Sequence, residues 1–196
     1  MIKNFILLCF YIGIVNTQII PPYQFSDWQV LQNEDIWVGW SNYQGFNWGK
    51  AKIRFNSSLD EVSSVLDNRK EYTNIFKRMT KCEENNDGVV YIVLDMPFPI
   101  SHRDYVVYYN QFKDKTHKVY HYYSTTHTDF PVDPHNIRLP RATGEWRLIP
   151  IDKNTTELIY TWNGELLGDF PDFALTRAWR EQGDEVMTWL KESLNK

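Results

Sequence analysis

The sequence predicts an α+β fold in which a curved antiparallel sheet packs against a long C-terminal helix. In the middle of the chain, 76–165, segments of strand-like composition follow one another with only short polar breaks, which is typical of an antiparallel meander. The stretch 171–194 instead repeats its apolar residues at helical spacing. A chain of 196 residues is long enough for one domain with a sizeable core, so we treat 18–196 as a single unit.

The first 17 residues are predicted to be a signal peptide. Lys3 precedes an apolar run from Phe5 to Val15, which is too short to span a membrane as a helix. Val15 and Thr17 are small enough for a cleavage site. We therefore expect cleavage after Thr17 and a secreted or periplasmic protein. A buried N-terminal helix is the alternative interpretation of the same run.

Two short helices and a hairpin are predicted before the meander. The first helix is expected at 24–32, and the hairpin at 35–43 and 46–56, where apolar and charged residues alternate along the second arm. Ser58 and Glu61 have the spacing of a capping box, in which each residue satisfies a backbone amide of the other. A short amphipathic helix is expected to follow.

The meander is divided by turn residues, beginning with Asn86, Asp87 and Gly88, which tolerate positive φ. Its strands are predicted at 76–84, 89–96, 104–112, 117–126, 138–150 and 156–165. The last helix, 171–194, carries Gly183 in its interior at a cost of roughly 1 kcal/mol relative to alanine. This glycine is a candidate weak point if the helix moves.

Composition excludes several classes of function. A net charge of −4 without a long basic cluster argues against binding to nucleic acid. The sequence contains no zinc-like spacing of Cys and His, no phosphate loop and no nucleophile elbow, so we expect no metal, no cofactor and no catalytic residues. The chain carries 8 Trp, 12 Tyr and 11 Phe, rings that must fill either a thick core or the walls of a cavity.

Three segments, in the same order along the chain as in the family, resemble START domains, the lipid-transfer domains related to the steroidogenic acute regulatory protein. Residues 97–109 (PFPISHRDYVVYY) look like the family's Pro-x-Pro and Arg-Asp-Tyr/Phe-Val signature. Residues 136–150 (NIRLPRATGEWRLIP) are similar to its Ile-Arg and Trp-x-x-x-Pro segment. Residues 156–173 (TELIYTWNGELLGDFPDF) resemble the approach to its last helix. The resemblance covers most of 24–194.

The resemblance implies the helix-grip fold, an incomplete barrel around a tunnel for one phospholipid, sterol or similar molecule. By that resemblance the protein binds and transfers or senses a hydrophobic ligand, makes transient contact with a membrane and is a monomer. The last helix and a neighbouring loop would then close the tunnel. In cholesterol-binding members, an arginine stands six positions after the motif arginine and faces the tunnel. Here that position is Tyr109.

The candidate ligand-binding residues have rings that can supply apolar wall or hydroxyl and guanidinium groups that can anchor a polar head, except Val107, which shares a strand face with Tyr105 and Tyr109. Ordinary core packing, or for Arg138 a surface ion pair, is the alternative for each. Arg103 and Asp104 stand at a strand entrance and are predicted to be a structural clamp rather than a catalytic pair. The ligand-binding candidates are Tyr91, Tyr105, Val107, Tyr109, Tyr120, Tyr122, Arg138, Trp146, Trp162 and Trp179.

Two other functions stay open at this point. Some helix-grip proteins are cyclases or hydrolases of hydrophobic substrates, and that chemistry would here need a general acid such as Tyr109 or Asp95. A protein-interaction module with a filled core is the third hypothesis. A carrier predicts one ligand per chain without turnover, an enzyme predicts accumulating product, and an interaction module predicts a partner patch on the outside.

Overall fold

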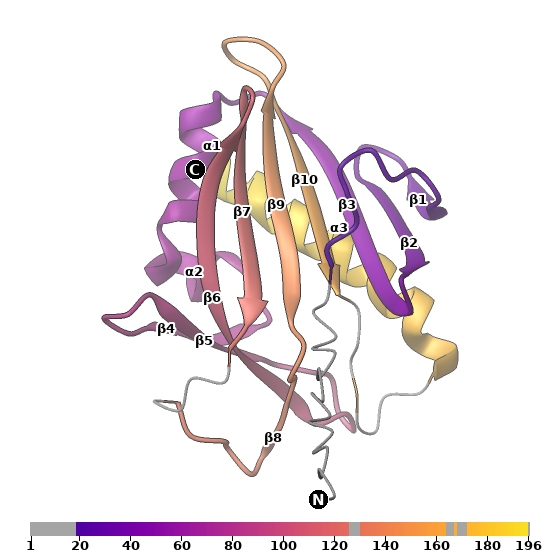
Figure 1. Ribbon diagram of the computed structural model, residues 1–196, viewed down its shortest axis with the longest axis vertical. Helices are drawn as coiled ribbons and strands as arrows, with labels where there is room; N and C mark the ends of the chain where they lie inside the picture. The colour runs from indigo at the N-terminus through magenta and orange to yellow at the C-terminus, as the bar shows by residue number, and fades with distance from the viewer. Residues whose placement is uncertain (1–18, 126–129, 164–166, 168–171, 196) are drawn as a thin grey trace, which may run out of the picture.

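The computed structural model describes residues 19–125, 130–163, 167 and 172–195 (Figure 1). The predicted signal peptide lies outside these residues, and so does residue 171, at which the last helix was predicted to begin. Within the described part of the chain, no helix has the length and apolar character needed to cross a bilayer.

Ten strands of the described residues form one curved sheet, which confirms the predicted fold class. The order is β1-β2-β3-β10-β9-β7-β6-β5-β4, all antiparallel, and β8 pairs with β6 in parallel. The sheet is not closed into a barrel. Its strands are β1 (Gln29–Asn33), β2 (Trp37–Tyr43), β3 (Phe46–Phe55), β4 (Met79–Glu84), β5 (Val89–Leu94), β6 (His102–Asp114), β7 (His117–Ser124), β8 (Asn136–Arg138), β9 (Thr143–Pro150) and β10 (Thr156–Asn163).

The helices lie on the concave side of this sheet, with α3 crossing behind the strands (Figure 1). The predicted capping box is present at the start of α1: the Glu61 amide donates to Ser58 Oγ at 3.3 Å, and the Ser58 amide donates to Glu61 Oε2 at 2.7 Å. The helices are α1 (Leu59–Asp67), η1 (Arg69–Glu71), α2 (Tyr72–Ile75), η2 (Asp172–Ala174) and α3 (Leu175–Leu194).

The predicted helix at 24–32 is wrong, because most of its second half is strand β1. The ladder with β2 supplies backbone hydrogen bonds that a short isolated helix cannot match. Before the strand, the chain turns: the Phe25 amide donates to the Pro22 carbonyl at 2.9 Å, and Trp28 Nε1 donates to the Phe25 carbonyl at 2.9 Å. Phe25 and Trp28, which fall in the predicted helix, are used in this turn.

Two strand boundaries also differ from the prediction. The segment 138–150 is not one strand, because β8 ends at Arg138 and β9 begins at Thr143. Pro140 lies in the gap and has no amide proton to give to a ladder. The segment 76–84 begins as a strand only at Met79, after the helical turn α2.

Gly183 lies where α3 comes closest to the sheet. A Cβ atom at this position would stand 2.9 Å from Val38 Cγ1 and 3.1 Å from Trp162 Cη2. The missing side chain therefore lets α3 approach β2 and β10, which is a packing reason for the propensity cost of this glycine. The approach fixes the height of the helix above the concave face.

Candidate functional site: a cavity under the last helix

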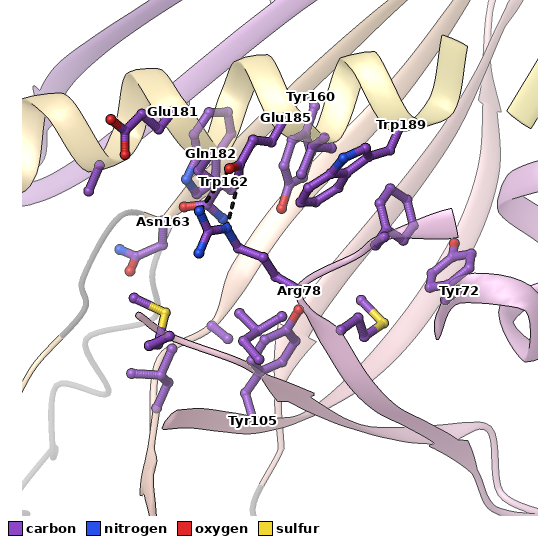
Figure 2. A pocket seen from close by; sticks show the side chains of 18 of the residues that line it. Tyr72, Arg78, Tyr105, Tyr160, Trp162, Asn163, Glu181, Gln182, Glu185 and Trp189 are labelled. Atoms are coloured by element: carbon purple, nitrogen blue, oxygen red, sulfur yellow. Dashed lines mark hydrogen bonds and ion pairs between the residues drawn. The ribbon is translucent and has the colours of Figure 1, made fainter. Parts of the chain in front are cut away.

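A cavity of about 370 Å³ lies between α3 and the concave face of the sheet (Figure 2). This volume is at the lower end of the range of roughly 300–1,000 Å³ that ligand pockets span. Most of its wall is apolar or aromatic, and it reaches the surface beside exposed Pro97 and Arg177. Other lining residues include Phe76, Met79, Leu94, Met96, Ile100, Leu139, Ala142, Ala174, Ala178, Val186 and Trp189.

The sheet contributes a floor of tyrosines because alternate residues of a strand point to the same face. Tyr105 and Tyr109 come from β6, Tyr122 from β7 and Tyr160 from β10. The hydroxyls of Tyr122 and Tyr160 are hydrogen-bonded at 2.9 Å. Gly144 makes room for this pair, since a Cβ there would stand 2.5 Å from the Tyr122 hydroxyl.

A stack of three rings forms the wall beneath α3. The Tyr160 ring lies between Trp146, at a centroid distance of 3.8 Å, and Trp162, at 4.7 Å. Neither indole N–H has a hydrogen-bond acceptor among the described residues. The stack is a flat, rigid surface suited to the apolar body of a ligand.

Two tyrosine hydroxyls in the wall have no hydrogen bond within the described residues, those of Tyr105 and Tyr109. Both side chains keep accessible surface deep inside the protein, because that surface faces the cavity. Figure 2 shows Tyr105 pointing from its strand towards Arg78 and α3. Burial raises the pKa of both phenols well above 10.0, so they stay neutral and can donate a hydrogen bond.

Among the described residues that line the cavity, the charged ones come from α3 and from the residue before β4. Arg78 donates through Nε to Glu185 Oε2 at 2.6 Å and through Nη2 to Glu185 Oε1 at 2.7 Å. The paired carboxylate raises the pKa of the Arg78 guanidinium. On the next turn of α3, Arg177 Nε donates to Glu181 Oε1 at 2.7 Å. Figure 2 shows Arg78 reaching across the cavity to the helix.

The rim of the cavity carries two fully displayed phenylalanines. Phe98 stands between the lining residues Pro97 and Ile100 and is 98% exposed. Phe173 precedes the lining residue Ala174 and is 89% exposed. Both rings therefore face solvent beside the opening of the cavity.

Arg103 and Asp104 fasten both faces of β6, and both are fully buried. Arg103, on the concave side, donates to the carbonyls of Ser101 and Leu167, the latter at 2.7 Å. Asp104, on the convex side, accepts hydrogen bonds from Arg138 and from the Tyr91 hydroxyl, the latter at 3.1 Å. These contacts hold β6 to Ser101, to Leu167 and to the strands β5 and β8, and neither Arg103 nor Asp104 is among the residues that line the cavity.

The structure separates the predicted ligand-binding residues into two groups. Five of them line the cavity: Tyr105, Tyr109, Tyr122, Trp146 and Trp162. The other five, Tyr91, Val107, Tyr120, Arg138 and Trp179, do not line it. Because the backbone of β6 and β7 sets which tyrosines face inward, alternation alone brought Tyr105, Tyr109 and Tyr122 together.

Tyr91 and Arg138 lie on the convex side, where the Tyr91 ring stacks on Phe130 and Arg138 pairs with Asp104. Val107 and Tyr120 face inward but pack in the core away from the cavity, and the Tyr120 hydroxyl donates to Asp67 of α1 at 3.0 Å. Trp179 packs against Trp40 of β2, on a side of α3 that does not line the cavity. Asp95, the alternative general acid, is outside the cavity wall and pairs with His102 at 3.0 Å.

Sequence reasoning missed the Arg78–Glu185 pair, Tyr160 and Tyr72. The first two residues are separated by 107 positions and carry no local motif. Tyr160 had a usable signal, because it alternates with Trp162 along β10 and so shares its face.

No known protein-family profile matches the sequence. An uncharacterized protein of Pseudomonas aeruginosa is 26% identical over 156 residues, which cover 76% of this chain and 77% of that protein. A fragment of a STAR-related lipid transfer protein from Xanthomonas axonopodis superposes with a TM-score of 0.75, at 20% identity, over 87% of this chain and all of that one. The fold is that of a START domain.

Other structures with this fold differ in their described activities. The human StAR-related lipid transfer protein 5 has a TM-score of 0.73 at 17% identity and covers 86% of each chain. The Zhui aromatase/cyclase from Streptomyces sp. R1128 has a TM-score of 0.52 at 18% identity, over 76% of this chain and 93% of that one. The fold alone therefore does not determine the function, which has to be argued from the residues that line the cavity.

Proposed function

We propose that this protein binds one hydrophobic ligand in the cavity under α3 and transfers it between membranes. The observation that carries the proposal is the cavity itself. It has a volume of about 370 Å³ and a largely apolar and aromatic wall between the sheet and α3. Binding is driven by the burial of apolar ligand surface, at about 25 cal/mol per Å². The lipid-transfer proteins with the same fold support this proposal.

Transfer requires the ligand to leave a bilayer without crossing water. Phe98 and Phe173 stand on two separate segments at the rim of the cavity and are exposed almost completely. Both rings can enter the interface of a bilayer and hold the opening against it. Contact with the membrane is transient in this scheme, because two rings bury too little area for permanent anchoring.

The first experiment is native mass spectrometry of the purified protein, followed by extraction and identification of any bound lipid. One lipid class at one molecule per chain is the expected result, and it also reports the monomeric state. A protein that carries no lipid and takes up neither fluorescent phospholipid nor fluorescent sterol would overturn the proposal.

The membrane step is tested separately by transfer of a labelled lipid between neutral vesicles. Phe98→Ser with Phe173→Ser should slow transfer about tenfold or more while leaving ligand binding in solution unchanged. Ile151→Ser is the matched control: Ile151 is 48% exposed and belongs to the β9–β10 turn, far from the rim (Figure 1). An equal loss in the control would show a general effect of surface hydrophobicity instead.

We propose no catalytic step. Tyr109 lines the cavity, but its raised pKa makes the phenol a weak acid. Turnover of a bound ligand, detected as accumulating product that depends on Tyr109, would favour the enzyme hypothesis. We also propose export directed by residues 1–17, and sequencing of the N-terminus of the mature protein tests it: a chain that still starts at Met1 contradicts export.

A further inference from the structure

We propose that the Arg78–Glu185 ion pair makes the cavity selective for ligands without net charge, and that Glu185 is the residue that excludes anionic lipids. The inference rests on the proposed function, since it names the ligand class of the same cavity. It concerns a pair formed between the residue before β4 and α3, two elements that meet at the cavity.

The charges that line the cavity cancel in pairs. Among the described residues, four charged side chains contribute to the wall: Arg78, Arg177, Glu181 and Glu185. Arg78 is joined to Glu185 and Arg177 to Glu181. No guanidinium in this wall is therefore left over to attract a phosphate or a carboxylate, and no carboxylate is left over to attract an ammonium group.

Glu185 occupies the place on Arg78 that an anionic head group would need. The two carboxylate oxygens accept from Nε and Nη2 in the parallel fork arrangement with which arginine binds carboxylates and phosphates. A ligand anion can reach this fork only by displacing Glu185. The displaced carboxylate, 30% exposed, would then lie unpaired beside a second negative charge, which is unfavourable in a partly buried site.

The groups that remain available to a ligand are neutral. Tyr105 and Tyr109 each present a hydroxyl to the cavity, and both are held uncharged by burial. A hydroxyl can bind an alcohol, an ester or a ketone oxygen, which carries no charge into the wall. The cavity thus fits a compact apolar body with an uncharged oxygen function.

The experiment compares two fluorescent single-chain lipids with the same labelled tail, a fatty acid and its glycerol monoester. The wild-type protein should bind the ester about tenfold or more tightly than the acid at pH 8. Glu185→Gln should increase the affinity for the acid about tenfold, since it frees a guanidinium, and leave the ester unchanged. The double variant Arg78→Gln/Glu185→Gln should lose this gain.

Glu192→Gln is the matched control. Glu192 lies on α3, as Glu185 does, and the substitution breaks its ion pair with Lys77. The side chains of Lys77 and Glu192 are 62% and 51% exposed and do not line the cavity. The control should leave both affinities unchanged. Thermal unfolding of each variant shows that it is folded, and the ester-to-acid ratio of the wild type tests selectivity even if Glu185→Gln does not fold.

The outcomes separate this inference from the proposed function. A wild-type protein that binds neither lipid, and no other fluorescent lipid or sterol, overturns the proposed function. A wild-type protein that binds acid and ester equally, or a folded Glu185→Gln variant with an unchanged ratio, overturns the inference and leaves the carrier intact. An equal gain in Glu192→Gln also overturns it, because general charge would then explain the effect.

Discussion

The two faces of β9 show two ways of burying polar groups in one strand. On the concave face, Trp146 stacks on Tyr160 and helps to enclose an open cavity. On the convex face, Glu145 and Arg147 are buried next to each other and join through hydrogen bonds of 2.8 Å and 3.1 Å. The concave face of β9 places neutral groups around the cavity, and the convex face packs charged groups against each other.

The charged groups of the convex face form a continuous network. Glu145 also bonds to His121 Nε2 at 2.7 Å, and Arg147 donates to Asp114 Oδ2 at 2.6 Å. The segment 19–28 covers them, with Lys50 lying 4.3 Å from the centre of the Trp28 ring. Burial, with the neighbouring Lys52, lowers the pKa of Lys50 to about 8. Buried charges are tolerated here because almost every one of them has a partner, whereas unpaired hydroxyls are tolerated in the cavity because they stay neutral.

The largest loss of stability is expected from a substitution of Glu145. Glu145→Ala should lower the free energy of unfolding by about 3 kcal/mol, because it removes the carboxylate that pairs with buried Arg147 and accepts a hydrogen bond from His121. Glu157→Ala removes a carboxylate from the same sheet, but its partner Arg54 is 67% exposed, and the loss should stay below about 1 kcal/mol. Urea unfolding measures both, and equal losses would contradict the distinction.

Acid should weaken the same network. Burial alone would raise the pKa of Glu145, but the hydrogen bonds from His121 and Arg147 outweigh it and hold the pKa below 4.5. The stabilisation is therefore complete above pH 4.5 and is lost as the pH falls through the lower pKa of the folded state. Urea unfolding between pH 7 and pH 3 should show a smaller decrease for Glu145→Gln than for the wild type. Parallel curves would refute this assignment.

Filling the close approach between α3 and the sheet should cost less. Gly183→Ala gains about 1 kcal/mol of helix propensity but places a methyl group 2.9 Å from Val38, at an overpacking cost of about 1–3 kcal/mol. We expect a net destabilisation of about 1 kcal/mol in thermal unfolding. Val38→Ala introduced together with it should restore part of the loss, and a stabilised single variant would show that the helix can shift freely.

The smallest effects are expected on the cavity face. Tyr160→Phe removes the partner of the Tyr122 hydroxyl and should cost about 1 kcal/mol. Tyr105→Phe removes a hydroxyl without a hydrogen bond, so the free energy of unfolding should change by less than about 0.5 kcal/mol. Ligand affinity should nevertheless fall severalfold in the second variant. A clear loss of stability there would mean that the hydroxyl is already used within the protein.

Local pattern predicted the fold well because each element carries its own signal. The capping box at Ser58 and the alternation along β6 are read from neighbouring residues, and both are present in the structure. The break at Pro140 was also readable, since proline cannot join a ladder, but the segment was treated as one strand. The predicted helix at 24–32 was wrong because hairpin pairing with the next strand, β2, outweighed local composition.

The cavity was predicted less completely, because enclosure depends on partners that the sequence does not place. Tyr120 and Tyr122 share a face of β7, yet α1 covers the first and leaves the second at the cavity. Tyr91 has a ring and a hydroxyl, as the tyrosines of the cavity wall do, but its pairing with Val106 puts it on the convex side of the sheet. Arg78 and Glu185 are 107 positions apart and meet only in the folded chain, where α3 passes the residue before β4, so no local spacing predicts their contact.

The ring stack in the wall provides an optical signal of its own. All eight tryptophans lie in the described residues, and three of them, Trp146, Trp162 and Trp189, line the cavity. Indole emission depends on the polarity around the ring, so a molecule that fills the cavity should shift part of the intrinsic fluorescence towards shorter wavelength. Unlabelled compounds could then be titrated directly, without the bulk of an attached dye competing for a space of about 370 Å³.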